Sequence, residues 1–194
     1  MRRYQYFNPE QLKTGGKVLM KKFYSKRLYL RQMDKADAPE LLKIWSDPEV
    51  TKYMNINRFS SEKEAIDMIN FLNELAEEKK AIRYSIFSKQ TNELIGSCGF
   101  NSLDEENRKT EIGYDLAKAH WGKGYASEAI TILLETAFET LEFHRVEAKV
   151  EPENVNSIKV LEKLNFTYEG RLRQAEISKG RFVDLKLYSK LRTD

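Results

Sequence analysis

The stretch EIGYDLAKAHWGKGYASEA, residues 111–129, decides the fold. In its first part Ile112, Tyr114 and Leu116 alternate with polar or small residues, which is the period of a β-strand. The segment GKG at residues 122–124 marks a turn, and the apolar residues that follow recur at helical spacing. The stretch therefore predicts a strand, a glycine turn and an amphipathic helix in immediate succession.

The start of this helix offers a place for an anion. The first backbone N–H groups of a helix have no partner within it, and the helix dipole adds partial positive charge there. Such a terminus suits a phosphate or pyrophosphate, although an ordinary strand–turn–helix connection stays open as the alternative. The glycines lack the lysine spacing of a Walker motif, which disfavours a nucleotide hydrolase.

The composition is that of a globular protein. The 194 residues are 41% hydrophobic and 32% charged, which is enough for one sizeable core. The net charge of +3 is small and no polybasic block occurs, so no direct nucleic-acid partner is expected. No apolar run approaches the roughly 18 residues of a membrane span, and the N-terminus lacks the apolar segment of a secretory signal. We therefore predict a cytoplasmic protein without a membrane partner.

Cys98 is the single cysteine, which excludes an intrachain disulfide and fits a reducing compartment. Its mid-strand position predicts a small buried core residue rather than a nucleophile. Its spacing from His120 and His144 matches no metal site, so no metal is expected.

The order of predicted elements is β-α-α-β-β-β-α-β-α-β-β, an α+β chain with a mixed sheet. Residues 1–22 lack periodicity and predict an N-terminal extension, a flexible arm or an upstream start, and residues 23–194 predict a single domain. The predicted helices begin after Asp37 as a candidate N-cap, at Ser60 or Ser61 (of which Ser61 has capping-box spacing to Glu64), after the glycine turn, and at Asn154. The predicted strands cover residues 28–33, 82–87, 94–100, 110–116, 145–150, 166–172 and 182–191, the second to fourth of them forming an antiparallel meander.

Several segments together resemble the GNAT superfamily of N-acetyltransferases, specifically the RimJ/RimL-type branch that acetylates the N-terminal amines of ribosomal proteins. They are RLYLR, WSDPEVTKYM, WGKGYASEA, NVNSIKVLEKLNF and EGRLRQAE, spread between residues 27 and 176. The resemblance covers about residues 26–192 and implies the GNAT fold, with a mixed, mostly antiparallel central sheet flanked by helices. Trp121 stands where the superfamily pattern has Gln or Arg. Asn165 replaces the usual Gly after the helix that begins at Asn154.

The resemblance also implies a site for acetyl-CoA as acetyl donor. Its pyrophosphate would lie on the backbone amides of the glycine turn, with Lys123 as an electrostatic helper. Its pantetheine arm would lie between splayed strands, one ending near Leu116 and one starting near Arg145. The residues implied to bind acetyl-CoA are Leu116, Ala117, Trp121, Gly122, Lys123, Gly124, Tyr125, Ala126 and Asn154.

The implied chemistry is direct attack of an amine on the thioester. An α-amino group has a pKa of about 7.7–8.0, so removing its proton needs only a modest general base. The resemblance assigns the acid and base roles to Ser157 and Glu176, while Glu111 stays open as a rival base. The alternatives are that Ser157 is a capping serine and Glu176 a surface carboxylate. A backbone N–H near Leu116 is the candidate donor to the oxyanion.

The acceptor is expected to be a protein N-terminal amine. A small amine such as a polyamine, amino acid or antibiotic stays open, because a fold does not fix its substrate. A non-catalytic acyl-CoA-binding module is the third alternative, and the chain is expected to be a monomer or homodimer. An acceptor pocket or, alternatively, core packing is expected for Trp45, Tyr53, Met54 and Phe59.

Overall fold

The computed structural model describes residues 11–14, 17–20 and 22–194. Strand β1 (Gln11–Thr14) pairs antiparallel with β2 (Lys17–Met20). The predicted extension over residues 1–22 falls largely outside the described residues, so it stays a prediction. The predicted single domain over residues 23–194 likewise stays a prediction. Strand β3 (Lys22–Tyr24) joins the main sheet.

The described chain builds one sheet of eight strands in the order β3-β4-β5-β6-β7-β8-β10-β9. All neighbours in this sheet are antiparallel except β7 and β8, which are parallel. This confirms the predicted mixed, mostly antiparallel sheet. The further strands are β4 (Leu28–Gln32), β5 (Ile82–Ser88), β6 (Leu94–Asp104), β7 (Lys109–Leu116), β8 (Arg145–Val150), β9 (Thr167–Ser178) and β10 (Arg181–Leu191).

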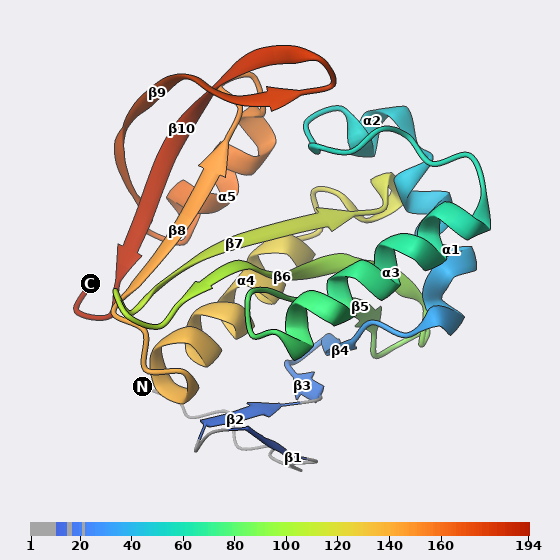
Figure 1. The fold of residues 1–194 in the computed structure, drawn as a ribbon, viewed down its shortest axis with the longest axis horizontal. Coiled ribbons are helices and arrows are strands. Elements are labelled where there is room, and N and C mark those ends of the chain that lie inside the picture. Colours follow the sequence, from blue (N-terminus) through green and yellow to red (C-terminus); the bar gives the residue numbers. More distant parts are fainter. Residues whose placement is uncertain (1–10, 15–16, 21) are drawn as a thin grey trace.

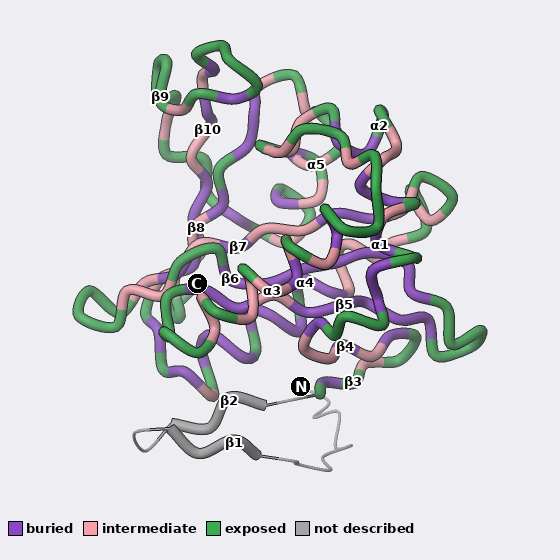
Figure 2. Tube along the Cα trace, turned by 45° about the vertical axis from the view of Figure 1, so that its right-hand side comes forward, coloured by how far each residue is buried: buried purple, intermediate pink, exposed green. Residues whose placement is uncertain are grey.

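Helices cover both faces of the sheet (Figure 1). Helices α1 (Ala38–Trp45) and α3 (Glu62–Glu77) enclose one apolar cluster against one face. Helices α4 (Tyr125–Glu135) and α5 (Val155–Lys163) enclose the larger cluster against the other. Burial therefore concentrates in the middle strands, whereas β9 is exposed along most of its length (Figure 2).

Most local signals in the sequence produce the predicted elements. Ser61 and Glu64 form the predicted capping box at the start of α3. Asn165 has a φ of 58°, the left-handed conformation expected after α5. The short helix α2 (Pro48–Thr51) and strand β3 were not predicted, because four or fewer residues give no periodic signal.

The predicted role of Asp37 is wrong in one respect. Asp37 precedes α1 as expected, but its side chain does not cap α1. It accepts from the backbone N–H of Asp34 at 3.0 Å, in the capping box of the preceding 3-10 turn (Lys35–Asp37), and from Arg31 and Ser85, which lie on neighbouring strands. The charge-assisted hydrogen bonds to the Arg31 guanidinium are the stronger kind, so the carboxylate faces the strands rather than α1.

The strands β7 and β8 diverge, and this divergence positions the site. They pair only where residues 109–111 face residues 145–147. Beyond that point the strands separate, as Figure 1 shows between the label of β7 and that of β8. The backbone of β7 past Glu111 is left without a partner strand on this side, as the resemblance implied.

Candidate active site

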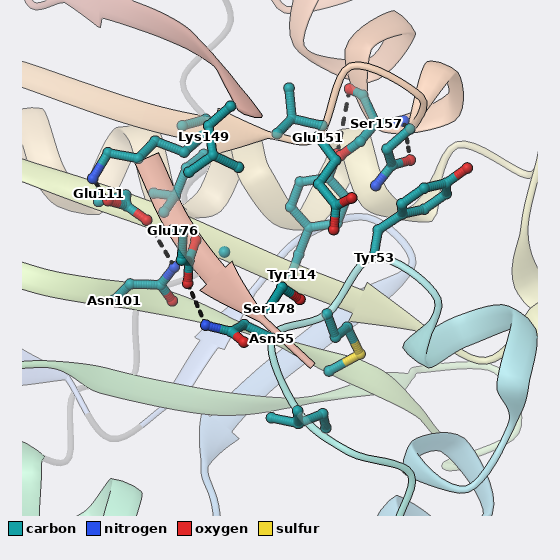
Figure 3. Close-up of a pocket in the computed structure, with 18 of the residues that line it drawn as sticks. Tyr53, Asn55, Asn101, Glu111, Tyr114, Lys149, Glu151, Ser157, Glu176 and Ser178 are labelled. Atoms are coloured by element: carbon teal, nitrogen blue, oxygen red, sulfur yellow. Dashed lines mark hydrogen bonds and ion pairs between the residues drawn. The ribbon is translucent and has the colours of Figure 1, made fainter. Parts of the chain in front are cut away.

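A cavity of about 330 Å³ opens where β7 and β8 diverge. Its walls come from these two strands, the start of α5, the β9–β10 hairpin and the loop after α2 (Figure 3). Ser157, Glu176 and the rival base Glu111 all line it, together with Asn154. Side chains that lie up to 65 residues apart in the chain (111 to 176) therefore meet in one place.

Ser157 faces the cavity from the first turn of α5. The N-cap of this helix is Asn154, whose Oδ1 accepts from the backbone N–H of Ser157 at 3.2 Å. The Ser157 hydroxyl is therefore not needed as a cap, and it lies 2.5 Å from the hydroxyl of Tyr114. Burial raises the pKa of Tyr114 to about 12, so its phenol stays protonated at neutral pH. The two hydroxyls form one hydrogen bond between them and keep a second proton to donate.

Glu176 reaches the cavity because of a bulge in β9. Leu172 pairs with Leu185 and Glu176 with Val183, so three residues of β9 stand opposite Asp184 alone. An unbroken register would place Glu176 opposite Arg181 at the hairpin end, and the bulge moves it two positions back over the cavity.

Asp184 holds this bulge in place. Its carboxylate accepts from the backbone N–H of Gln174 at 2.7 Å and from Arg171 Nε at 2.6 Å. Gln174 has a φ of 48°, a left-handed conformation that this hydrogen bond stabilises. Across the cavity, Asn55 of the loop after α2 donates to Glu176 Oε1, which orients the carboxylate (Figure 3).

Glu111 has an environment different from that of Glu176. Lys149 Nζ lies 2.7 Å from one of its oxygens and Asn101 Nδ2 lies 3.2 Å from the other. The Glu111 carboxylate in turn raises the pKa of Lys149. Both oxygens of Glu111 therefore have a hydrogen-bond donor, and Glu111 stays a rival candidate for the general base.

Glu151 is a third carboxylate of the cavity and was not predicted from the sequence. It follows β8, and its side chain is only 8% exposed. Burial raises its pKa, because the charged form is removed from water. Its place between a strand end and Pro152 gave no signal beyond that of an ordinary loop residue.

The aromatic residues and the methionine expected near the acceptor divide into two groups. Trp45, Tyr53 and Met54 line the cavity. Phe59 does not line it, because its ring packs edge-on against Trp45 at a centroid distance of 5.4 Å. The acceptor-pocket prediction is wrong for Phe59, which is a packing residue.

The glycine turn has the features of an anion site. Gly122 and Gly124 have φ angles of 70° and 79°, which favour glycine. Gly124 is the N-cap of α4 and has no side chain that could accept a capping hydrogen bond. The first backbone N–H groups of the helix are therefore not capped by a side chain. Arg27 braces the turn, with its Nη1 on the Lys123 carbonyl at 2.9 Å and its Nε on Glu128 at 2.6 Å.

Of the residues implied to bind acetyl-CoA, Asn154 is the one that lines the cavity. The others lie at the far end of β7 and the start of α4, outside it. Trp121 joins these two places, because its Nε1 donates to the carbonyl of Leu116 at 2.8 Å. This contact gives a structural reason for an indole where the superfamily pattern has Gln or Arg.

Cys98 is fully buried, which confirms its prediction as a core residue. Burial raises the pKa of its thiol to about 12, so it holds its proton. Within residues 11–14, 17–20 and 22–194, no group of three or more His, Cys, Asp or Glu side chains is arranged to hold a metal. No helix in the same part of the chain is long and apolar enough to cross a membrane.

Comparison with known proteins gives consistent matches. Residues 27–167 match the family model described as "Acetyltransferase (GNAT) domain". The chain is 51% identical over 175 residues to the uncharacterized N-acetyltransferase p20 of Bacillus licheniformis, covering 90% of this chain and 98% of the relative. It is 34% identical over 99 residues to the ribosomal-protein-serine acetyltransferase of Escherichia coli K12, covering 51% and 55%. The solved structure of RimL, a ribosomal L7/L12 alpha-N-protein acetyltransferase in complex with coenzyme A, superposes with a TM-score of 0.76 at 25% identity, covering 86% of this chain and 95% of RimL.

Proposed function

Because the chain belongs to the GNAT family of acetyltransferases, we propose that it transfers the acetyl group of acetyl-CoA to the α-amino group of a protein N-terminus. The observation that carries this proposal is that one cavity between the diverging strands is lined by both Ser157 and Glu176. An acid and a base on opposite sides of one cavity suit an amine attacking a thioester.

The chain's own residues supply a donor site of the right chemistry. The first amides of α4, with Gly122 and Gly124 before them, face an anion such as a pyrophosphate. The backbone of β7 past Glu111 has no partner on β8 and can pair with the amide groups of a pantetheine arm as an added strand would. When bound, acetyl-CoA supplies the acetyl group and a thiolate leaving group.

In the proposed reaction Glu176 takes a proton from the acceptor ammonium. The neutral nitrogen attacks the thioester carbon, a C–N bond forms and the C–S bond breaks. Ser157 gives its proton to the departing sulfur, and the Tyr114 hydroxyl 2.5 Å away supports the serine oxygen. The attacking nitrogen loses a second proton as the amide forms, and this proton restores the Ser157 hydroxyl. The proton taken up by Glu176 passes to solvent, so one proton is released for each acetyl group transferred. General acid–base groups of this kind contribute roughly 10²–10⁴-fold to a rate.

The acceptor assignment rests on the relatives and on the cavity. The Escherichia coli relative is named for acetylating a serine of a ribosomal protein, and the superposed RimL for an α-amine of L7/L12. The cavity, with Tyr53 and Met54 in its wall, has room for one terminal residue of a polypeptide.

A panel of acceptors tests the proposal. The protein is incubated with acetyl-CoA and a tetrapeptide that begins with serine, the same peptide with a blocked N-terminus and an internal lysine, or spermidine. Thiol release is followed, and mass spectrometry locates the acetyl group. We expect acetylation of the free α-amine alone. Turnover with spermidine alone would indicate a small-amine enzyme, and a CoA-dependent thermal shift without any turnover would indicate a binding module.

A further inference from the structure

Glu151 carries a buried charge that the protein balances poorly. Its carboxylate lies in the cavity wall and points into the cavity (Figure 3). Its one polar side-chain contact within the described chain is Arg181 Nη2 at 3.5 Å. That distance exceeds the usual hydrogen-bond range, and the Arg181 side chain is 67% exposed, so water screens its charge.

The surroundings of Glu151 do not compensate for this. Burial raises its pKa, the neighbouring Glu153 and Glu176 raise it further, and Arg181 and Lys179 oppose them. A carboxylate held out of water is stabilised by any cation that enters beside it. Lys149, a lysine in the lining of the cavity, is already paired with Glu111.

We propose that Glu151 pairs with the protonated amine of the acceptor as it enters the cavity, so that the enzyme selects cationic amines over neutral groups of the same shape. This rests on the proposed function, in which an amine attacks acetyl-CoA. Glu151 belongs to the end of β8 and Glu176 to β9, so one carboxylate can hold the ammonium while the other receives its proton.

The test variant is Glu151→Gln, which keeps the shape of the side chain and removes its charge. The matched control is Glu153→Gln, since Glu153 is exposed, does not line the cavity and stands two residues away. Calorimetry of the CoA-loaded protein compares a serine tetrapeptide with its desamino analogue, which lacks the α-amine. A hydrogen bond to a charged group corresponds to about 10- to 150-fold in affinity.

We expect the wild-type protein and Glu153→Gln to prefer the amine by at least about tenfold, and Glu151→Gln to lose this preference. The KM for the acceptor should rise in Glu151→Gln, with the KM for acetyl-CoA and the melting temperature unchanged. An equal amine preference in wild type and Glu151→Gln would overturn the inference.

A second pair of probes separates this inference from the proposed function. If the wild-type protein acetylates spermidine and not the peptide, the N-terminal acceptor is wrong. The role of Glu151 is then tested by comparing the affinity for spermidine with the affinity for a neutral diol of equal length. Glu151→Gln is again expected to lose the preference for the charged probe. A wild-type protein that prefers neither charged probe over its neutral analogue would overturn the role of Glu151.

Discussion

The hydroxyl oxygens of Tyr114 and Ser157 lie 2.5 Å apart, although 43 residues separate them in the chain. Tyr114 reaches this place from β7 and Ser157 from the first turn of α5. The phenol is buried and its pKa is raised to about 12, so the pair is neutral and can give a proton at physiological pH. In the proposed reaction this pair is the acid that meets the leaving sulfur.

Removal of either hydroxyl should slow turnover. We expect Ser157→Ala to lower kcat by about 10²- to 10⁴-fold and Tyr114→Phe by about tenfold, because serine makes the direct transfer. The KM for acetyl-CoA should change little in either variant. Steady-state kinetics at saturating acceptor measures both effects.

Tyr84→Phe is the matched control for the loss of a buried tyrosine hydroxyl. The Tyr84 hydroxyl is buried without a hydrogen-bond partner among the residues that the structure describes, so its removal should leave kcat unchanged and stability equal or higher. A wild-type kcat in Ser157→Ala would remove Ser157 from the mechanism.

The bulge that places Glu176 gives a second prediction. Asp184→Ala removes the acceptor of the Gln174 N–H at 2.7 Å, so the bulge should relax and Glu176 should move toward the hairpin end. We expect kcat to fall by about tenfold or more, as misplacement of a reacting group commonly does, with little change in the KM for acetyl-CoA.

Asp104→Ala is the control for this variant. Asp104 also accepts from a backbone N–H, that of Asn107 at 2.9 Å, but in the β6–β7 turn away from the cavity. The Asp104→Ala variant should lose some stability and keep the wild-type kcat. Equal kcat values in Asp184→Ala and Asp104→Ala would show that the bulge does not govern the position of Glu176.

The glycine turn gives a third prediction. Gly122 and Gly180 both have positive φ angles, 70° and 78°, and a Cβ added to either would meet nothing within 4 Å. Alanine at each should therefore destabilise the protein by a similar amount, about 1–2 kcal/mol. If the amides before α4 hold the pyrophosphate, Gly122→Ala should also raise the KM for acetyl-CoA, because its methyl group enters that space. An unchanged KM in both variants would place the donor elsewhere.

Acid stability gives a fourth prediction. Arg145 of β8 forms a bidentate ion pair with Glu169 of β9, in which its Nη1 and Nη2 donate to the two carboxylate oxygens at 2.7 and 2.5 Å. This pairing lowers the pKa of Glu169 from 4.5 to about 2. A lowered pKa in the folded state stabilises the protein above pH 4.5, and this contribution is lost as the pH falls toward 2.

Glu169→Gln should therefore unfold more easily than wild type at neutral pH, by about 1 kcal/mol because the pair is partly exposed, and the difference should vanish in acid. Urea unfolding at a series of pH values measures it. Glu139→Gln, which affects a loose 3.9 Å pair with Arg192, should follow the wild-type curve. A stability difference for Glu169→Gln that is as large at pH 2 as at neutral pH would contradict the assignment.

The fold was largely predictable because its signals are local. The capping box at Ser61, the left-handed Asn165 and the alternation through Tyr114 each depend on neighbouring residues. The candidate site residues were proposed only through the resemblance, and their roles stay predictions. The register shift opposite Asp184 and the burial of Glu151 arise from contacts between distant segments, which no periodic pattern reports.

The most direct test of the central claim compares wild type with Glu176→Gln on a serine tetrapeptide and acetyl-CoA across a pH series, with mass spectrometry locating the acetyl group. We expect wild type to place one acetyl group on the α-nitrogen. Glu176→Gln should be slower by about 10²-fold or more near neutral pH and should recover partly at high pH, where the amine is already neutral. Undiminished turnover by Glu176→Gln at every pH, or an acetyl group found anywhere except the α-nitrogen, would contradict the account.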